Sequence, residues 1–440
     1  MKQIVVRFPP SPTGEIHIGN VRTLLFNFLF ARQNNGKIIF RFEDTDKERS
    51  SQDLEKPMLH ALDMLGLSWD EGPFRQSERG EIYKKYLHEL VEKGLAYEAE
   101  ENNSGTGKII RLKNVERDIV WQDLVKGEIK INTHTFKDES GNADIIIARS
   151  IDDAIYHFTV VVDDWLMGVT HVIRGDDHIT STPRQIMILE ALAASIPQYA
   201  HLPTIVGEDR KKLSKRNGTT SLQMFFDMGY LKETMVNYLA LLGWNPGGDR
   251  EFFTMAELVK EFSLEKCQVS PAQFDFKKLD HINKHYLDKL SSKEYLEYVN
   301  IPELDDKIIL KVLRERINKN SEIEAMNANG DFNMFDQKLW EGEYKSFDKN
   351  MILFKGQVLH EAQANLKVVT ELIEKVSEEN WTVENLKKEI WDWSATVGRG
   401  TVLHPLRMVL SLRAQSPDPF TIMEIVGKTE SLRRIANFLN

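Results

Sequence analysis

The sequence is poor in cysteine and has no long apolar run. Cys267 is the only cysteine among 440 residues. A single thiol cannot build a disulfide framework, and the clustered histidines that a zinc site with one thiolate would need are missing. No stretch reaches the ~18 apolar residues of a transmembrane helix. We therefore expect a reducing, cytoplasmic compartment, no membrane partner and no disulfide-stabilised secreted fold.

Several familiar sequence signals are also missing. Residues 1–8 (MKQIVVRF) read as a buried strand from the third residue on, which leaves no room for a targeting segment. Residues 105–108 (GTGK) resemble a phosphate loop, but the full GxxxxGK[ST] pattern and the third glycine of a dinucleotide fingerprint are absent. A turn is the better interpretation of these four residues. The sequence has no internal repeat and no long low-complexity tract.

The composition is that of a globular protein with several cores. Hydrophobic residues make up 41%, charged residues 28% and aromatic residues 9% of the chain, which fits neither a disordered nor a fibrous protein. At ~150 residues per domain, the length indicates about three domains. The net charge of −10 argues against a broad polyanion-binding surface. A nucleic-acid partner, however, requires only a local basic face.

The N-terminal sequence alternates strand and helix patterns, as an open α/β sheet does. Residues 4–6 form a buried strand, which nearby prolines end. Residues 17–33 carry apolar side chains at helical spacing, Gly36 follows as a stop, and residues 37–42 (KIIFRF) give a second strand. Loop 9–14 is thus expected at the carboxyl edge of the first strand, where ligands bind in open α/β sheets.

The middle of the chain has a different character. Residues 76–155 have weaker periodicity and read as an insertion, with antiparallel strands at 129–136 and 145–148. The α/β pattern resumes at 156–162 (YHFTVVV) and 170–173, and an amphipathic helix follows near 183–194.

The last half of the chain is mainly helical in pattern after residue 220. Thr254 and Glu257 have the spacing of a capping box. Pro405 is expected at a first helical position, and Gly427 at the end of the helix before the last one.

The most informative stretch is SPTGEIHIGN at residues 11–20. Its prolines and glycine hold a loop open above the sheet, and His17 and Asn20 fall in the first turn of the next helix. A helix N-terminus presents N–H groups and positive potential, so a polyphosphate is a natural ligand. Gly19 lets a flat ring approach the backbone. A plain strand-to-helix turn with a surface histidine explains the same residues.

A second stretch, RKKLSKR at residues 210–216, has five cations in seven residues. A solvated basic loop is one explanation. The other is phosphoryl or adenylyl chemistry, which needs cations that stabilise charge on the α-phosphate and the leaving pyrophosphate. Lys212 and Lys215 are the candidates for that role.

Taken together, four stretches in one order and spacing resemble a known family. They are FPPSPTGEIHIGN at 8–20, FEDTDKER at 42–49, VIRGDDH at 172–178 and KLSKR at 212–216. They resemble the class I glutamyl-tRNA synthetases, with residues 17–20 at the family's HIGH signature and residues 212–216 at its KMSKS signature. The similarity runs from residue 3 to about 290, and beyond that it rests on helical character and residues 397–414.

The resemblance implies an α/β fold class with a Rossmann-like parallel sheet split by an α+β insertion. A stem-contact domain and an all-helical anticodon-binding part should follow. The implied boundaries are 1–75 and 156–221 for the catalytic domain, 76–155 for the acceptor-binding insertion, 222–294 for the stem-contact domain, and 295–440 for the anticodon-binding region, which can be divided near 355.

The resemblance also implies the residues that bind glutamate. Its two carboxylates and one ammonium require two cations and an anion. Arg7 would pair with the side-chain carboxylate, assisted by Tyr156, and Arg174 would hold the α-carboxylate. Ser11 and Glu43 would meet the ammonium. Taken singly, Arg7 could instead be a surface residue on an edge strand, and Glu43 a helix cap or an ion-pair partner.

For ATP, the resemblance places His17 and Asn20 against the phosphates and ribose and Gly19 under the adenine. Thr13 and His178 are further implied contacts.

The implied catalytic residues are His17, Asn20, Lys212 and Lys215, with Lys215 on the pentavalent α-phosphate and Lys212 in support. Glutamate attacks the α-phosphorus of ATP to give glutamyl-adenylate and pyrophosphate, and a terminal tRNA hydroxyl then attacks the acyl group. Positioning and charge neutralisation suffice for this chemistry. Cys267 is therefore a packed or surface thiol.

The implied partners are tRNA-Glu, ATP and L-glutamate, with tRNA-Gln left open, and the chain is expected to be a monomer. Thr45 and Arg49 are implied tRNA contacts, and Arg316 aligns with an arginine that reads the third anticodon position. Arg314 and Arg316 could equally be solvated helix residues. Mg²⁺ is expected with ATP, held mostly by phosphates and water. Residues 97–114 lack the cysteines of relatives with a zinc knuckle, so no zinc is expected.

Four alternatives remain at this point. A glutamine-specific relative typically has Pro-Glu-Pro-Asn-Gly in its first loop, whereas residues 10–14 here are PSPTG. A shorter relative that glutamylates a modified base lacks the helical region after about 295. A nucleotidyltransferase acting on a small metabolite would be much shorter. A silent tRNA-binding paralogue would not need His17, Lys212 and Lys215.

Overall fold

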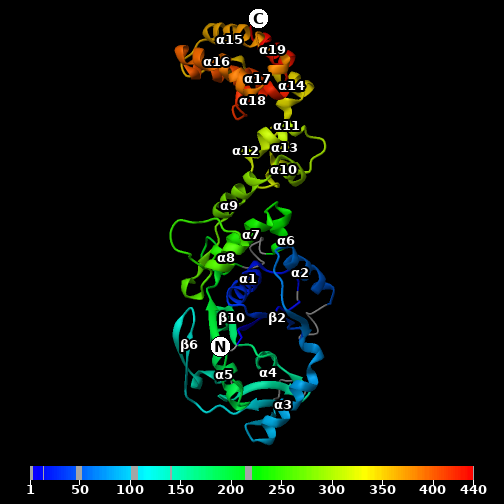
Figure 1. Ribbon diagram of the computed structural model, residues 1–440, viewed down its shortest axis with the longest axis vertical. Helices are drawn as coiled ribbons and strands as arrows, with labels where there is room; N and C mark the ends of the chain where they lie inside the picture. The colour runs from blue at the N-terminus through cyan, green and yellow to red at the C-terminus, as the bar shows by residue number, and fades with distance from the viewer. Residues whose placement is uncertain are drawn as a thin grey trace. The chain divides into compact units, whose positions relative to one another are not determined.

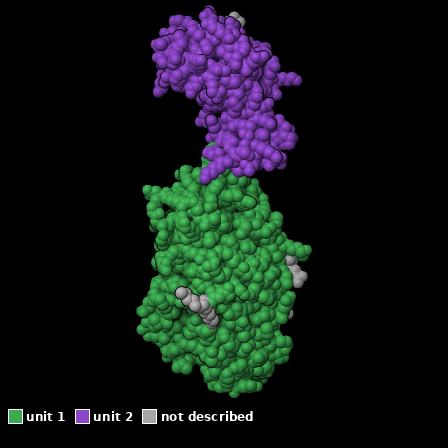
Figure 2. Space-filling view, in the orientation of Figure 1, with its two compact units in different colours: residues 1–286 green, residues 287–440 purple. Residues whose placement is uncertain are grey.

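The computed structural model describes residues 3–12, 14–45, 52–100, 108–138, 141–213 and 221–439. The chain divides into two compact units, residues 1–286 and 287–440, which Figure 2 colours separately. Each unit has a hydrophobic core of its own and so meets the physical criterion of a domain. Within the described part of the chain, no helix has the length and apolar character needed to cross a membrane.

A parallel β-sheet forms the centre of the first unit (Figure 1). Strands β1 (Val5–Phe8), β2 (Lys37–Phe42) and β3 (Glu71–Arg75) lie side by side, and β10 (His171–Gly175) pairs with β11 (Gln198–Leu202). The two groups meet where Thr170 N donates to Val5 O at 2.9 Å. The carboxyl ends of β1, β2 and β10 therefore share one edge, as expected of a Rossmann-like sheet.

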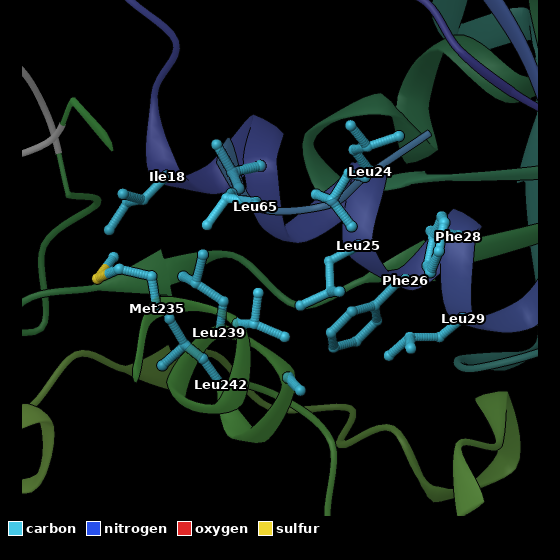
Figure 3. Packing of buried hydrophobic residues seen from close by; sticks show 14 of the residues in the cluster. Ile18, Leu24, Leu25, Phe26, Phe28, Leu29, Leu65, Met235, Leu239 and Leu242 are labelled. Atoms are coloured by element: carbon cyan, nitrogen blue, oxygen red, sulfur yellow. The ribbon is translucent and has the colours of Figure 1, made fainter. Parts of the chain in front are cut away.

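Helix α1 (Ile18–Gln33) follows the first strand, as the apolar spacing predicts. It packs into the core of the first unit with α7 (Lys232–Leu241), and Figure 3 shows Leu24 and Leu25 of α1 in one cluster with Leu239 of α7. Glycine is required at position 36 because the backbone of Ile4 passes close by: a Cβ on residue 36 would lie 2.7 Å from Ile4 O. The end of the helix is not what requires this glycine. Asn35, with φ of 50°, makes the left-handed turn instead.

Residues 76–155, for which we keep the name insertion, contain helix α3 (Gly80–Glu92), an antiparallel sheet of order β4-β5-β8-β9 and the hairpin β6-β7. The strand bounds are β4 Ala96–Glu100, β5 Lys108–Leu112, β6 Asp118–Asp123, β7 Gly127–Asn132, β8 Ile145–Ser150 and β9 Asp153–Ala154. The two predicted strands are confirmed, except that residues 133–136 form a 3-10 turn. Asp123 of β6 pairs with Tyr199 of β11, so the hairpin extends the parallel sheet. Of the expected turn at 105–108, residues 105–107 lie outside the described residues, and Lys108 is the first residue of β5.

Segment 156–162, where the α/β pattern was expected to resume, forms the first part of helix α4 (Tyr156–Leu166). Its β-branched run resembles a buried strand, but residues 158–164 are all buried. A helix that is covered on every side loses the 3.6-residue periodicity that distinguishes it from a strand. The predicted strand at 170–173 is β10, and the predicted amphipathic helix is α5 (Thr182–Ala191).

The rest of the first unit is mainly helical. Its helices are α2 (Gln52–Met64), α6 (Leu222–Asp227), α8 (Met255–Glu261) and the start of α9 (Phe276–Lys289), and β12 (Ile205–Val206) pairs with β13 (Ala272–Gln273). The capping box of Thr254 and Glu257 is confirmed at the start of α8. Cys267 is packed inside the core, and burial raises the pKa of its thiol to about 12.

The second unit contains helices throughout its described residues, 287–439. They are α10 (Ser292–Val299), α11 (Asp306–Ile308), α12 (Arg314–Arg316), α13 (Glu322–Ala328), α14 (Gln337–Tyr344), α15 (Leu359–Glu374), α16 (Val383–Val397), α17 (Arg399–Ser411), α18 (Pro419–Val426) and α19 (Lys428–Ala436). Gly427 ends α18 with φ of 83°, as expected.

Pro405 does not begin a helix, so that expectation is wrong. It lies inside α17. A proline inside a helix leaves the carbonyl four residues earlier, here that of Thr401, without its helical donor. Two side-chain amides supply the missing donors, because Gln357 Nε2 and Asn365 Nδ2 donate to Thr401 O at 2.9 and 3.0 Å. These long-range donors cannot be read from the local sequence.

Candidate active site

A cavity of ≈ 570 Å³ opens at the carboxyl edge of the parallel sheet, within the size range of small-molecule sites. Among the predicted site residues, those that line it are Arg7, Ser11, His17, Gly19, Asn20, Glu43, Thr45, Tyr156, Arg174, His178 and Lys212. Thr13, Arg49 and Lys215 lie outside the described residues. The remaining predicted residue, Arg316, belongs to the second unit.

Arg7 is buried in one wall of the cavity and is no surface residue, with 2% of the residue exposed. Its Nε donates to Asp164 Oδ2 at 3.1 Å. The other oxygen of Asp164 accepts from Nη2 of the fully buried Arg41 at 2.8 Å. Although burial acts to raise it, these two arginines hold the pKa of Asp164 below its ordinary value. One carboxylate thus fixes two cations behind the cavity.

Asp163 ties the same wall to the insertion. It accepts hydrogen bonds from Gln76 Nε2 at 3.0 Å, Arg79 Nε at 2.7 Å and Tyr83 Oη at 2.8 Å. Arg41 Nε lies 3.5 Å from the same carboxylate. The donors come from α3 and the segment just before it, so the start of the insertion is anchored directly behind the cavity.

Glu43 is a buried carboxyl group with an incomplete set of partners. Its Oε1 has no hydrogen-bond partner among the described residues, and Arg41 Nη2 lies 3.8 Å away. Burial raises the pKa of Glu43 to about 7, against the opposing charges of Arg41 and Arg7. A buried acceptor without a donor is costly, so the group suits a cationic ligand.

Arg174 lies in a second wall, on β10 next to β1, and is held by neutral groups. Its Nη1 donates to Gln185 Oε1 at 2.8 Å, its Nη2 to Thr182 Oγ1 at 2.8 Å and its Nε to His201 Nε2 at 3.2 Å. Among the described residues, no carboxylate lies within ion-pair distance of it. Burial lowers the pKa of Arg174 below its ordinary value. This cation therefore lacks the counter-charge that Arg7 has.

Tyr156, at the start of α4, and His178 also line the cavity. Tyr156 Oη is 3.4 Å from His178 Nδ1. Burial and the charge of Glu43 raise the pKa of Tyr156 to about 12, and burial with Arg174 lowers the pKa of His178 to about 4. At neutral pH the tyrosine is thus protonated and the histidine neutral.

The start of α1 forms another part of the lining. His17 is the helix cap, and its Nδ1 accepts from Gly19 N at 2.9 Å, while Asn20 N donates to His17 O at 2.8 Å. The first-turn N–H groups of Gly19 and Asn20, which the sequence suggested for an anion, are therefore already engaged. A Cβ on Gly19 would lie 3.1 Å from His17 Nδ1, so glycine keeps this turn compact. Lys212 Nζ donates to Asp177 Oδ2 at 3.0 Å.

The two arginines of α12 differ in their contacts. Arg314 is not simply solvated, because its Nη2 donates to Asp288 O at 2.9 Å and to Leu290 O, and its guanidinium lies over the Tyr295 ring. Arg316 is partly exposed, and its Nη2 lies 3.5 Å from Asp331 Oδ2.

Several buried polar residues around the cavity were missed by the sequence argument. They are Arg41, Asp123, Asp163, Asp164, Thr182, Gln185 and His201. For three of them a signal exists, since Arg41 interrupts the apolar KIIFRF and Asp163 with Asp164 follows the apolar FTVVV. Charged residues are almost never fully buried unless they are paired. Charges inside strongly apolar runs could therefore have been proposed as partners.

Comparisons with known proteins agree with this arrangement. Residues 3–108 and 98–281 match the family "tRNA synthetases class I (E and Q), catalytic domain", and residues 254–439 match "Anticodon binding domain". Glutamate–tRNA ligase 2 of Thermoanaerobacter pseudethanolicus is 38% identical, covering 99% of this chain and 98% of its own. The glutamate–tRNA ligase of Thermodesulfovibrio yellowstonii is 39% identical and covers 99% of each chain.

A solved structure is similar over the whole chain. It is the crystal structure of a glutamate tRNA ligase from Elizabethkingia meningosepticum in complex with its amino acid. The TM-score is 0.79 at 27% identity, with 100% of this chain and 99% of that chain covered. From the sheet-edge cavity, the order of the two matched regions and the full-length relatives, we conclude that the chain belongs to the glutamate–tRNA ligases, within the class I tRNA synthetases.

Proposed function

We propose that the sheet-edge cavity of this glutamate–tRNA ligase binds L-glutamate and ATP together and forms glutamyl-adenylate there. One observation carries the proposal: the buried cations Arg7 and Arg174 and the buried acceptor Glu43 line the same cavity as His17 and Lys212. Holding both substrates in one cavity brings the glutamate carboxylate to the α-phosphorus of ATP. No covalent enzyme intermediate is needed for this step.

For glutamate, the charges of the cavity support the roles that the resemblance implies. Arg7 with Tyr156 binds the side-chain carboxylate, and Arg174, a cation without a counter-charge, binds the α-carboxylate. Glu43 accepts from the ammonium through the oxygen that has no partner among the described residues, and Ser11 assists. Two cations and one acceptor match the charges of glutamate.

For ATP, the proposal uses the start of α1 and Lys212. His17 accepts a hydrogen bond at Nδ1, so a neutral ring carries its proton on Nε2, which is a suitable donor to phosphate. Asn20 and Gly19 contact the ribose and adenine, with Thr13 and His178 as further contacts. Lys212 neutralises phosphate charge after leaving Asp177, and Lys215 stabilises the α-phosphorus in the transition state.

We propose Mg²⁺ as the companion of ATP, bound mainly by phosphate oxygens and water. Asp177 lines the cavity and Asp176 precedes it in the chain. They are engaged with Lys126 and Lys212, so they fit a role through bound water better than direct ligation. When bound, the ion neutralises phosphate charge. We propose no zinc site, because residues 97–114 carry no cysteine.

Pyrophosphate exchange tests the assignment of the ATP site. If Lys215 acts only in the transition state, Lys215→Ala lowers the activation rate by roughly two orders of magnitude or more, while ATP affinity changes far less. The measurement is ATP–pyrophosphate exchange with glutamate in the presence of tRNA. An equal loss of rate and of affinity would mean that the lysine merely holds ground-state ATP.

For tRNA, we propose that the insertion and the residues Thr45 and Arg49 meet the acceptor end, that residues 222–294 contact the stem, and that Arg316 reads the third anticodon base. The partial exposure of Arg316 and its long 3.5 Å contact with Asp331 support this, because the guanidinium can exchange that contact for a base. A bidentate arginine–base contact contributes ~1 to 3 kcal/mol of discrimination by analogy with DNA.

Charging tRNA-Glu and tRNA-Gln side by side tests the tRNA assignment. Wild type is expected to prefer tRNA-Glu, and Arg316→Ala to relax that preference. Arg314→Ala is the matched control, because Arg314 is anchored to backbone carbonyls. An unchanged ratio in Arg316→Ala removes the residue from the anticodon site.

A further inference from the structure

Arg174 is oriented by a histidine that itself has a fixed partner. The guanidinium donates from Nε to His201 Nε2 at 3.2 Å. His201 is fully buried, and its other ring nitrogen, Nδ1, lies 2.6 Å from Asp123 Oδ2. Asp123 is on β6, in the hairpin that the insertion adds to the sheet. A chain of three side chains thus runs from the insertion to the cavity wall.

The protonation pattern of this chain is set by its donors and acceptors. An ionised carboxylate only accepts, so His201 carries its proton on Nδ1 and donates to Asp123. The lone pair on Nε2 then faces the Nε–H of Arg174, and Thr182 Oγ1 lies 3.0 Å from the same nitrogen. Burial and the charge of Arg174 keep the pKa of His201 below its ordinary value. Burial acts to raise the pKa of Asp123, but the hydrogen bonds from His201 and Lys126 together hold it below its ordinary value.

We propose that Asp123 and His201 are positioning residues for glutamate binding: Asp123 fixes the tautomer of His201, and His201 Nε2 holds the Arg174 guanidinium at the cavity wall. This inference rests on the proposed role of Arg174 as a carboxylate-binding cation. It gives the insertion a part in forming the amino-acid site, in addition to its proposed contact with tRNA.

The variant Asp123→Asn is expected to change the tautomer of His201 while keeping nearly the same side-chain shape at position 123. Asp123 Oδ1 accepts from the backbone N–H groups of Val125 at 3.0 Å, Lys126 at 2.9 Å and His201 at 3.1 Å. Those three donors keep the amide oxygen of the asparagine on that side, so its NH₂ faces His201 Nδ1. The ring must then accept at Nδ1 and carry its proton on Nε2. That proton faces the Nε–H of Arg174 and Thr182 Oγ1, so Arg174 loses its acceptor on the ring.

Steady-state kinetics give the first readout. Asp123→Asn is expected to raise KM for glutamate about tenfold to a hundredfold, the range for a lost hydrogen bond to a charged group, with KM for ATP nearly unchanged. Asp118→Asn, on the same strand but exposed and paired with Lys130, is the matched control and should behave as wild type. A wild-type glutamate KM in Asp123→Asn overturns the proposal.

A double-mutant cycle separates the tautomer from general damage. His201→Gln keeps an acceptor oxygen for Arg174 but has no tautomer for Asp123 to fix. Asp123→Asn should therefore add little to the glutamate KM of His201→Gln, although it has a large effect alone. An equal increase in both backgrounds overturns the proposal. The cycle also remains informative if one single variant proves less stable.

Nitrogen NMR reads the tautomer without any kinetics. The His201 signals are identified by their loss in His201→Gln, since the chain has 12 histidines. Wild type should be protonated at Nδ1 and Asp123→Asn at Nε2, and a wild-type ring protonated at Nε2 overturns the inference. Arg174→Gln distinguishes the two proposals. An unchanged glutamate KM there refutes the role of Arg174 itself, whereas a raised KM there with a normal one in Asp123→Asn refutes only the positioning role.

Discussion

The two walls of the cavity hold their arginines in opposite ways. On the wall formed by β1, β2 and α4, Arg7 shares the carboxylate of Asp164 with Arg41. On the wall formed by β10, β11 and α5, Arg174 has only neutral acceptors, among them Gln185. Both arginines are buried, so the contrast lies in counter-charge and not in solvent access.

This difference indicates what each wall requires of a ligand. A buried cation without a counter-charge carries a desolvation penalty that an arriving anion relieves, and Arg174 is in that state. The wall that contains Arg7 already balances its cations but leaves Glu43 with an oxygen that has no partner among the described residues. A cation without a counter-charge and a carboxyl oxygen without a donor in the same cavity match the α-carboxylate and the ammonium of an amino acid. Arg7 then remains for the side chain.

The largest expected effect is on amino-acid use when Arg7, the cation paired with Asp164, is replaced. Glutamine is neutral, so binding it instead of glutamate would leave Arg7 without the negative charge of its ligand. We expect this to cost several kcal/mol, which is about a thousandfold preference for glutamate over glutamine. Arg7→Ala should therefore damage glutamate use severely and narrow the gap to glutamine, as measured by kcat/KM for each amino acid. Arg174→Gln is the control and should weaken both amino acids alike. Unchanged glutamate kinetics in Arg7→Ala would remove Arg7 from the pocket.

A smaller effect on stability distinguishes the charged wall from the neutral one. Asp164→Asn keeps the shape but leaves Arg7 and Arg41 short of one buried counter-charge, so we expect a loss of about 3 kcal/mol or more. Gln185→Leu removes one hydrogen bond from Arg174 and should cost about 1.5 to 3 kcal/mol at most. Urea unfolding followed by circular dichroism gives both values. Equal losses would mean that the two walls do not differ in charge balance.

The smallest expected effect concerns pH and Glu43. With a pKa of about 7, ionised Glu43 falls from about nine-tenths at pH 8 to about one-tenth at pH 6. Because only the ionised form pairs with the ammonium, KM for glutamate should rise up to about tenfold as the pH falls through this range. Tyr156 and His178, with pKa values of about 12 and 4, do not titrate there. Glu43→Gln should flatten the profile, and a profile that stays steep in that variant assigns the titration to another group.

Much of the site could be predicted from the sequence because its parts are local. The loop before α1 and the apolar spacing of residues 17–33 specify a strand, a turn and a helix, and they bring His17, Gly19 and Asn20 to the sheet edge. Short-range periodicity and turn chemistry suffice for such a unit.

The parts of the site that could not be predicted from the sequence depend on pairs of buried side chains that lie far apart along the chain. Asp164 meets Arg7 across 157 positions of the chain, and Asp123 meets His201 across 78. The neutral groups that accept hydrogen bonds from Arg174 likewise come from separate elements, β11 and α5. The position of Pro405 in α17 was misjudged for the same reason, because distant amide donors override the local pattern. The helical form of residues 156–162 was not specified by the sequence, because burial on all sides removes the helical periodicity.

The most direct measurement of the two-wall arrangement is a crystal structure of the chain with L-glutamate bound. We expect the side-chain carboxylate within hydrogen-bond distance of Arg7 and Tyr156, the α-carboxylate on Arg174, and the ammonium on Glu43. Glutamate bound with both carboxylates on one wall, or with its ammonium away from Glu43, would contradict the division of charge between the walls.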